Sequence, residues 1–399
     1  MDHLPEPSSA RAIVKLRPGK GRRLAEGAPW AFADEIALDR RTRKLAAGSL
    51  VQLLDGERSL GVAAFNADSR IAARLLDTDP NAEIGRDWLV ARLAAAEALR
   101  QRLYGAPFYR LVHAEGDGLP GVVIDRFGEA AVIQPNAAWA DRLLPDLVSA
   151  LVQVTGVGTV VVNATSRVRK LERLDEHLEI AQGTLDGPIE VPMNGALYLA
   201  ELMGGQKTGL FYDQRPNHAF VAGLAQGARV LDVFAHVGGF GLACLAAGAA
   251  EVTAVDSSAP ALELAGEGAT RMGMADRFTT QKSDAFAALE AHAGANLEIV
   301  ICDPPAFAPN RGALAQGLRA YQKVARLAAG AVAPGGLLVL CSCSHAAGAE
   351  AFHKACIEGI RGAGRSGALI HSGRAGPDHP VHIGLPETGY LKALVFRLT

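Results

Sequence analysis

Apolar residues in the first part of the chain fall in short runs that polar and glycine-containing breaks separate. The runs "AIVKL", "SLVQLLD", "LGVAAFN" and "IAARLLD" all lie within residues 11–78. Short apolar runs between turn residues are typical of strands in a small β-rich domain. We therefore expect such a domain at residues 11–80, preceded by a disordered terminus at residues 1–10, which is rich in proline and serine.

The middle of the chain mixes helical and strand patterns. The stretch "GRDWLVARLAAAEALRQRLYG" predicts a helix at residues 85–105, with Gly105 as its C-terminal cap. Strand patterns follow in "FYRLVHAEGDGLPGVVIDRFGEAAVIQ" and "GTVVVNA", and a helix is expected between them near residues 138–154. This mixture predicts a separate α+β domain at residues 81–190.

The pattern changes again near residue 196, where longer apolar strands alternate with helical segments. The strands are "ARVLDVF", "EVTAVD", "LEIVICD" and "GLLVLCS". Nearly continuous apolar strands separated by helices indicate a parallel sheet that is covered on both faces. We expect an α/β, Rossmann-like domain at residues 191–399, with the final stretch "GYLKALVFRLT" returning as an edge strand.

Length and composition indicate how many domains to expect and where in the cell the protein works. With 399 residues, 49% of them hydrophobic, the chain is long enough for two or three domains with real cores. Its five cysteines show no disulfide spacing, the first residues lack the apolar segment of a secretion signal, and no apolar run is long enough to cross a bilayer. The expected location is the reducing cytoplasm, without a membrane partner.

Charge is balanced overall and uneven locally. The net charge is −2, yet residues 11–23 hold six basic residues and no acidic one, and "RRTRK" covers Arg40–Lys44. Such clusters are found both on phosphate-binding surfaces and on ordinary solvated faces, and charge alone favours neither.

A glycine-rich turn follows the first strand of the C-terminal domain. The segment "RVLDVFAHVGGFGLACLAAGAAEVTAVDSS" runs from that strand through a helix to a second strand ending at Asp256. Glycines let the backbone approach a ligand at the carboxyl ends of strands, where an acid can accept hydrogen bonds from ribose hydroxyls. The spacing would also suit a nicotinamide enzyme, although the glycines do not form a G-x-G-x-x-G series.

Acids also follow the next two strands. Asp284 lies in "SDAF" after the third strand, and Asp303 lies in "DPPAF" after the fourth. This layout resembles class I S-adenosylmethionine-dependent methyltransferases, in which the first acid reads the adenine amino group and the second motif faces the methyl group. The resemblance implies a cofactor with a sulfonium cation, which needs carboxylates nearby and no metal. The alternative is a doubly wound binding domain whose strand-end acids are incidental.

The stretch "GGLLVLCSCSH" places Cys341 and Cys343 at the end of the next strand. A structural zinc site usually needs four ligands at another spacing, and a disulfide between residues this close would be strained. Two buried structural thiols are the simple alternative. The functional interpretation is nucleophilic, because a thiolate added to carbon 6 of a pyrimidine makes carbon 5 reactive enough to accept a methyl group. RNA cytosine-5 methyltransferases carry their nucleophile in a similar "C-S" motif, so we expect Cys343 to attack and Cys341 to be structural.

Nearly the whole chain resembles the bacterial ribosomal RNA large-subunit cytosine-5 methyltransferases with an N-terminal PUA domain. The resemblance rests on "KLRPGKGRRLAEGAPWAF", "RLVHAEGDGLPGVVIDRFG", "GGQKTGLFYDQR", "LDVFAHVGGFG", "DPPAF", "CSCSH" and "GPDHPVHIGLPETGYLKAL". Three segments depart from the family: "APNRGALAQG" after the "DPPAF" motif, "AGEGATRMGM" after Asp256, and "RVRKLERLDE", in which Arg167, Arg169 and Lys170 are candidate RNA contacts. The resemblance implies formation of 5-methylcytosine in 23S ribosomal RNA, naked or partly assembled, after the cytosine has been flipped out of any duplex.

The strand ends and the resemblance together give the expected site. The catalytic residues are Cys343 and Asp303, of which Asp303 would hydrogen-bond the cytosine. The expected cofactor-binding residues are Lys207, Thr208, Asp213, Gln214, Arg215, Asp232, Phe234, Gly238, Asp256, Ser257, Asp284 and Asp303. The expected substrate-binding residues are Arg17, Lys20, Arg22, Arg23, Pro304, Pro305 and Phe307. No metal ligand is expected.

Two other functions fit parts of the sequence. A methyltransferase acting on a guanine nitrogen would share "DPPAF" but would not need Cys343. A non-catalytic RNA-binding assembly factor would keep the fold, and the acids at the strand ends argue against it. The sequence does not determine the oligomeric state, and a homodimer is compatible with it.

Overall fold

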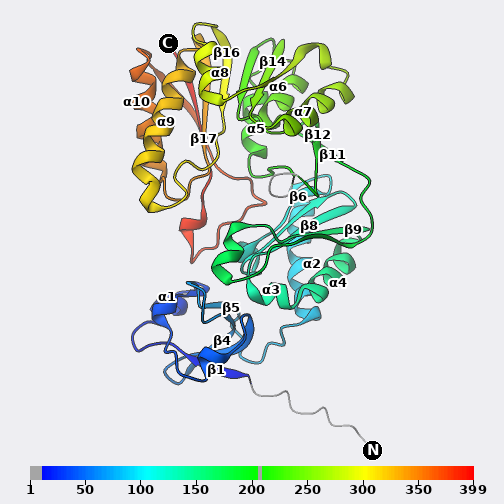
Figure 1. The fold of residues 1–399 in the computed structure, drawn as a ribbon, viewed down its shortest axis with the longest axis vertical. Helices are drawn as coiled ribbons and strands as arrows, with labels where there is room; N and C mark the ends of the chain where they lie inside the picture. Colours follow the sequence, from blue (N-terminus) through cyan, green and yellow to red (C-terminus); the bar gives the residue numbers. More distant parts are fainter. Residues whose placement is uncertain (1–10, 205–208) are drawn as a thin grey trace, which may run out of the picture. The chain divides into compact units, whose positions relative to one another are not determined.

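A computed structural model describes residues 11–204 and 209–399, to which every structural statement below refers. The chain forms two compact units, Met1–Leu185 with Pro380–Pro386, and Asp186–His379 with Glu387–Thr399 (Figure 1). Among the helices of the described residues, none has both the length and the apolar character needed to cross a membrane.

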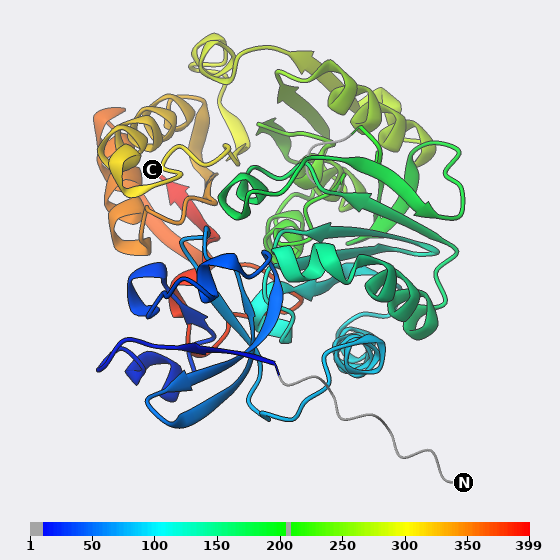
Figure 2. The ribbon, with the colours of Figure 1, turned by 60° about the horizontal axis from the view of Figure 1, so that its bottom comes forward.

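The first unit begins with a small five-stranded sheet, in the order β1-β3-β4-β5-β2 (blue in Figure 2). Its elements are β1 (Ala12–Lys15), α1 (Arg22–Ala25), β2 (Trp30–Ala31), η1 (Ala33–Glu35), η2 (Thr42–Lys44), β3 (Ser49–Asp55), β4 (Arg58–Phe65) and β5 (Ala73–Asp77). Alternate apolar residues of β1, β3 and β4, among them Val14, Val51 and Phe65, are fully buried in a common core. Four of the strands follow the apolar runs of the sequence, whereas the two residues of β2 are too few to leave a pattern.

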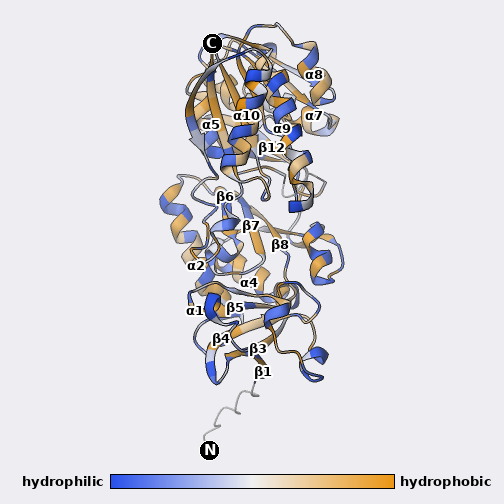
Figure 3. Cartoon of the chain, turned by 90° about the vertical axis from the view of Figure 1, so that its left-hand side faces the viewer, coloured by the Kyte–Doolittle hydropathy of each residue, from blue (hydrophilic) through white to orange (hydrophobic). Residues whose placement is uncertain are grey.

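A second five-stranded sheet, in the order β10-β9-β8-β7-β6, completes this unit. Its elements are α2 (Arg86–Leu103), β6 (Phe108–His113), η3 (Ala114–Asp117), β7 (Val122–Phe127), β8 (Ala130–Pro135), α3 (Ala138–Arg142), α4 (Leu144–Thr155), β9 (Thr159–Asn163), η4 (Arg167–Glu172) and β10 (Leu178–Gln182). Buried apolar residues of these strands and helices, Trp139 among them, form one core. The strands β7 and β8 carry long hydrophobic stretches, orange in Figure 3.

Two details of the helices differ from the sequence prediction. Gly105 does not cap α2, because the helix ends at Leu103 and Tyr104 turns to an extended conformation in which its ring stacks on Tyr109, 5.9 Å away. The helix expected near residues 138–154 is divided in two, because Leu143 leaves the helical conformation before α4 begins. In both places a local backbone change interrupts a helical sequence pattern.

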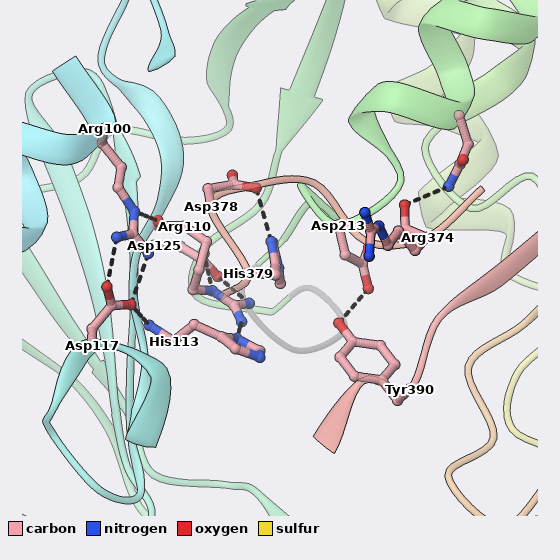
Figure 4. Close-up of polar contacts among 11 residues, drawn as sticks. Arg100, Arg110, His113, Asp117, Asp125, Asp213, Arg374, Asp378, His379 and Tyr390 are labelled. Atoms are coloured by element: carbon pink, nitrogen blue, oxygen red, sulfur yellow. Dashed lines mark hydrogen bonds and ion pairs between the residues drawn. The ribbon is translucent and has the colours of Figure 1, made fainter. Parts of the chain in front are cut away.

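Buried ion pairs hold the second sheet of this unit. Arg100 donates to both oxygens of Asp117, at 2.6 and 2.7 Å, and Arg110 pairs in the same way with Asp125 (Figure 4). Arg169, which we considered for RNA contact, is buried and donates to Asp141 at 2.8 Å. Breaking a buried pair leaves an uncompensated charge, so these arginines are structural.

The second unit contains a seven-stranded sheet, in the order β15-β14-β13-β16-β17-β19-β18, and a two-stranded ribbon of β11 and β12. Its strands are β11 (Ile189–Met193), β12 (Ala196–Ala200), β13 (Arg229–Val233), β14 (Glu251–Asp256), β15 (Phe278–Lys282), β16 (Leu297–Cys302), β17 (Val332–Ser342), β18 (Gly367–Gly373) and β19 (Lys392–Leu398). Its helices are α5 (Arg215–Ala222), α6 (Gly239–Ala246), α7 (Ala259–Arg271), η5 (Ala275–Arg277), α8 (Ala285–Ala291), η6 (Arg311–Ala313), α9 (Leu314–Ala329), α10 (Ala349–Gly362) and η7 (Pro386–Thr388).

The first five strands of this sheet are parallel, and the last strand of the chain corrects the prediction. We expected the stretch "GYLKALVFRLT" at an edge, but its strand β19 lies antiparallel between β17 and β18, and β18 forms the edge. The burial of the two strands gives the reason. Five of the seven residues of β19 are buried, whereas β18 is largely exposed.

Candidate active site

A cavity of about 580 Å³ lies at the carboxyl ends of the five parallel strands of the second unit. Residues that follow β13, β14, β15, β16 and β17 line it, because the carboxyl ends of parallel strands meet at one edge of a sheet. Its described lining includes the five aspartates Asp213, Asp232, Asp256, Asp284 and Asp303, and neither lysine nor arginine. The cavity therefore suits a cationic ligand.

The turn after β13 has an unusual backbone. Phe234 and His236 both have positive φ angles, +66° and +50°, which residues other than glycine rarely adopt and which cost about 1–3 kcal/mol each. The backbone N–H of His236 donates to Asp256 Oδ2 at 2.9 Å, which holds the turn in place. Gly239 follows, where a Cβ atom would come within 2.9 Å of the His218 ring. The turn thus brings bare backbone to the cavity wall.

Asp232 is the buried acid of this turn. Its Oδ2 accepts a 2.8 Å hydrogen bond from the backbone N–H of Gly241, and its side chain is almost fully buried. Burial, aided by the neighbouring charges of Asp303 and Asp256, raises the pKa of Asp232 to about 7, although the Gly241 bond opposes the rise. A cation in the cavity would favour its ionised form.

Asp256 and Asp284 end the next two strands. Asp256 accepts backbone N–H bonds on both oxygens, from His236 and from Ser258 at 2.9 Å each. Asp284 begins α8, and its Oδ1 accepts from Phe286 and Ala287 at 2.9 and 3.0 Å. These bonds fix each carboxylate, and a carboxylate oxygen has further lone pairs for ligand donors.

Asp303 is held by a chain of amides. Gln214 donates from Nε2 to Asp303 Oδ2 at 3.0 Å, and its Oε1 accepts from Asn217 at 2.7 Å. The Asp303 backbone N–H reaches the carbonyl of Val233 at 3.3 Å, across the join of β16 and β13. The carboxylate therefore has a fixed direction at the cavity wall.

Cys343 lies just beyond β17 and lines the same cavity, with its Sγ 4.0 Å from the carbonyl oxygen of Pro304. It is partly exposed, whereas the other four cysteines are buried. Burial raises the pKa of the Cys341 thiol well above its ordinary value, and the charge of Asp303 adds to the rise. Of the five thiols, Cys343 is thus the one that a ligand can reach.

Hydroxyl groups join the Cys343 loop to the loop after β16. Tyr321 Oη lies 2.9 Å from Ser342 Oγ and 2.7 Å from Ser344 Oγ. Ser344 Oγ also accepts from the backbone N–H of Ala308 at 3.0 Å. The serines beside Cys343 are buried, so their role is to fix the thiol's loop against the Asp303 loop.

Most of the site residues expected in the second unit come together. The expected residues that line the cavity are Asp213, Gln214, Asp232, Phe234, Asp256, Ser257, Asp284, Asp303, Pro304, Pro305 and Cys343. Arg215, Gly238 and Phe307 are not among the lining residues, and Lys207 and Thr208 lie outside the described residues. Arg215 lies over the ring of Tyr212, and Phe307 packs against Tyr321 with ring centroids 4.9 Å apart.

The expected basic residues belong to the first unit. Arg17 donates to the carbonyl of Ile36 at 3.1 Å, and Arg22 pairs with Glu26 at 2.8 Å on the exposed side of α1. Arg23 lies over the ring of Phe32, and Lys20 is exposed.

Sequence reasoning missed several lining residues. Phe211, His236, His345 and Tyr390 all line the cavity. Tyr390 donates to Asp213 Oδ2 at 2.6 Å, although 177 residues separate the two (Figure 4). No local pattern signals Tyr390, which reaches the site only because β19 enters the sheet beside β17.

A seven-stranded sheet of this order, with acids at the ends of β13 to β16 around an anionic cavity, defines a Rossmann-like methyltransferase domain. Comparison with known proteins agrees. Residues 142–397 match the S-adenosylmethionine-dependent methyltransferase family, and residues 14–78 match the PUA-like domain. The chain belongs to the family of the ribosomal RNA large subunit methyltransferases I, which the following relatives represent.

The relatives align over almost their whole length. Ribosomal RNA large subunit methyltransferase I of Shewanella amazonensis is 33% identical over 96% of this chain and 99% of its own. The ribosomal RNA large subunit methyltransferase of Deinococcus radiodurans is also 33% identical, over 98% of this chain and 99% of its own. A candidate methyltransferase crystallised with SAH has the same fold, with a TM-score of 0.81 at 19% identity over 97% of this chain and 100% of its own.

The cofactor of this family is S-adenosylmethionine, and the cavity fits it. Five aspartates without a lysine or arginine in the described lining match a ligand that carries a sulfonium and an ammonium group. Within the described residues, no group of three or more His, Cys, Asp and Glu side chains is placed to hold a metal ion.

Proposed function

We propose that the protein forms 5-methylcytosine in 23S ribosomal RNA of the large subunit, with Cys343 as a covalent nucleophile. The substrate class follows the names of the full-length relatives. The observation that carries the chemistry is that the one thiol of the chain that is not buried shares a cavity with Asp303. A methyltransferase of guanine nitrogens would have no use for that thiol.

The residues act in a fixed order. The Cys343 thiolate forms a bond to carbon 6 of the cytosine, and the electron pair of the 5,6 double bond is delocalised toward carbon 5 and the ring N3. When bound, S-adenosylmethionine supplies an electrophilic methyl group. Once carbon 5 carries the methyl group, a solvent base takes its proton, the electron pair of that C–H bond re-forms the 5,6 double bond, and the bond from carbon 6 to sulfur breaks to release the Cys343 thiolate.

Asp303 stabilises the adduct in this scheme. Its carboxyl group, oriented by Gln214, would hydrogen-bond the ring N3 or the amino group of the cytosine, where charge develops. The neighbouring prolines Pro304 and Pro305 line the cavity beside it and would contact the base. The proposed cofactor residues are those already on the wall, with Asp256 at the ribose, Asp284 at the adenine and Asp232 behind the methionine part.

The PUA-like domain would hold the RNA. Arg17, Lys20, Arg22 and Arg23 would contact backbone phosphates, which fix position without reading sequence. A single-stranded or flipped cytosine can then enter the cavity of the methyltransferase domain.

Product analysis tests the proposal. Undermethylated 23S ribosomal RNA would be incubated with the protein and labelled S-adenosylmethionine, and the nucleosides would be separated by mass spectrometry. We expect 5-methylcytosine. RNA containing 5-fluorocytosine should also trap a protein–RNA adduct, because fluorine replaces the proton that must leave. A methylated guanine, or no trapped adduct, would refute the covalent mechanism.

Cofactor binding should be linked to a proton at Asp232. Because the pKa of this acid is raised to about 7, a bound cation drives it toward ionisation and releases a proton. Affinity should therefore fall as the pH drops through 7. Titration calorimetry at pH 7 in two buffers of different ionisation enthalpy measures the release. Asp232→Asn should abolish it and Asp284→Asn should keep it; equal release from both variants would contradict the assignment.

A further inference from the structure

Lys392, the first residue of β19, lies behind the loop that carries Cys343. It pairs with Ser342 in the antiparallel register of β17 and β19. Its Nζ donates to the carbonyl oxygens of Ser344 and Ala347, at 2.7 and 2.8 Å. One ammonium group therefore ties together both ends of the segment that follows the thiol.

The surroundings of Cys343 otherwise disfavour a thiolate. The described cavity wall has no lysine or arginine, and it includes Asp303, the residue before the Pro304 whose carbonyl the Sγ approaches. A carboxylate near a thiol disfavours its ionisation, since two negative charges then repel each other. Without bound cofactor, a lysine or arginine of the described residues that favours the thiolate must therefore lie beyond this lining.

Lys392 is close enough to supply that charge. Burial lowers the pKa of Lys392 to about 8, and the thiolate of Cys343 opposes the fall. The interaction of two charges is mutual. Since the thiolate stabilises the ammonium group of Lys392, that ammonium group stabilises the thiolate of Cys343. At pH 7 Lys392 is still mainly protonated. Its ammonium group has three N–H donors, and the two carbonyls use two of them.

We propose that Lys392 is a positioning residue for Cys343, which fixes the loop of the thiol and stabilises its thiolate through charge. This role deepens the proposed function and rests on Cys343 as the nucleophile. Lys392 acts behind the loop and does not touch the reacting atoms.

Other titratable groups face Cys343 and belong in the interpretation of any pH profile. Asp303 follows β16, Cys341 lies on β17, and Tyr321 lies on α9. His345 follows in the loop, and Tyr390 precedes β19. Each is present in all the variants compared below, so a difference between these variants reports on Lys392.

Alkylation of Cys343 tests the proposal without RNA or cofactor. The protein would be treated with iodoacetamide from pH 6 to 10, and the labelled peptide quantified by mass spectrometry. Lys392→Met should slow labelling about tenfold at pH 7 and move the rise in rate to higher pH, because a neighbouring opposite charge shifts ionisation by about one unit or more. Lys392→Arg, which keeps the charge, should restore most of the rate.

Two controls make the outcome decisive. Lys354→Met removes an exposed lysine of α10, which pairs with Glu358 at 3.9 Å, and should leave the profile unchanged. The four buried cysteines report unfolding, since they become labelled if a variant loses its fold. Lys392→Gln provides a second neutral variant. An unchanged profile in a folded neutral variant overturns the proposal, and so does loss of the fold in both neutral variants, because the role would then be structural.

The result also separates this inference from the proposed function. If the RNA product is not 5-methylcytosine but labelling still depends on Lys392, the covalent mechanism fails while the link between Lys392 and the thiol stands. If 5-methylcytosine forms and labelling is indifferent to Lys392, only the further inference fails.

Discussion

Replacing Cys343 by alanine should reduce methyl transfer to ribosomal RNA about a thousandfold or more, because no other exposed thiol is present to activate the base. Single-turnover assays with labelled S-adenosylmethionine and undermethylated 23S RNA measure the rate. Cofactor affinity, followed by calorimetry, should change little. The side chain is small and partly exposed, so the variant should remain folded.

Cys341→Ala is the matched control. Cys341 is the same residue type two positions earlier, and it is buried in β17. Its loss should lower the melting temperature by a few degrees and leave turnover near the level of the unchanged protein. Full activity of Cys343→Ala would contradict the proposed nucleophile. Activity lost only in a folded Cys341→Ala variant would assign the role to the other thiol.

Asp303→Asn should lower the saturated rate by about 10²–10⁴-fold, the range typical of a group that moves or holds a proton in the transition state. Asparagine keeps an oxygen for the Nε2 donor of Gln214, so the chain of amides should survive. What is lost is the carboxyl proton, which could pass to the ring N3 as negative charge develops there. Rates at saturating cofactor and RNA, with the fold checked by circular dichroism, give the effect.

Asp284→Asn separates catalysis from cofactor binding. Asp284 lines the same cavity but ends a different strand, and its carboxylate caps α8. Its neutralisation should raise the KM for S-adenosylmethionine and leave the saturated rate within a few-fold. If Asp303→Asn instead behaves like Asp284→Asn, with an effect on KM alone, Asp303 belongs to the cofactor site and not to the reaction.

The carboxyl edge of the parallel sheet could be predicted from sequence, and the reason is physical. Asp284 follows the polar strand "FTTQK", and its place came from the resemblance to methyltransferases. Asp232, Asp256 and Asp303 each stand at or beside the end of an apolar run. Parallel strands bring such ends to one edge, so a one-dimensional pattern is enough to place these acids together. The Cys343 loop follows by the same rule from the end of β17.

The remainder of the site depends on contacts that no local pattern contains. Tyr390 reaches the cavity, and Lys392 reaches the loop of the thiol, because β19 enters between β17 and β18. The apolar run of β19 does not reveal which strands lie beside it. In the sequence, Ser342 and Ser344 belong to the expected nucleophile motif. In the structure their hydroxyls bond to Tyr321, which lies 21 residues before Ser342 and 23 before Ser344. Sequence periodicity reports which residues are buried, not which partners they meet.

The excess of aspartates on the cavity wall also bears on the end of the catalytic cycle. Once the methyl group has left, the spent cofactor is a thioether and has lost the positive charge on its sulfur. The wall, with five aspartates and neither lysine nor arginine among its described residues, then attracts it less than it attracts fresh cofactor. The same charges that draw in the methyl donor thereby speed its exchange, and they limit inhibition by the product.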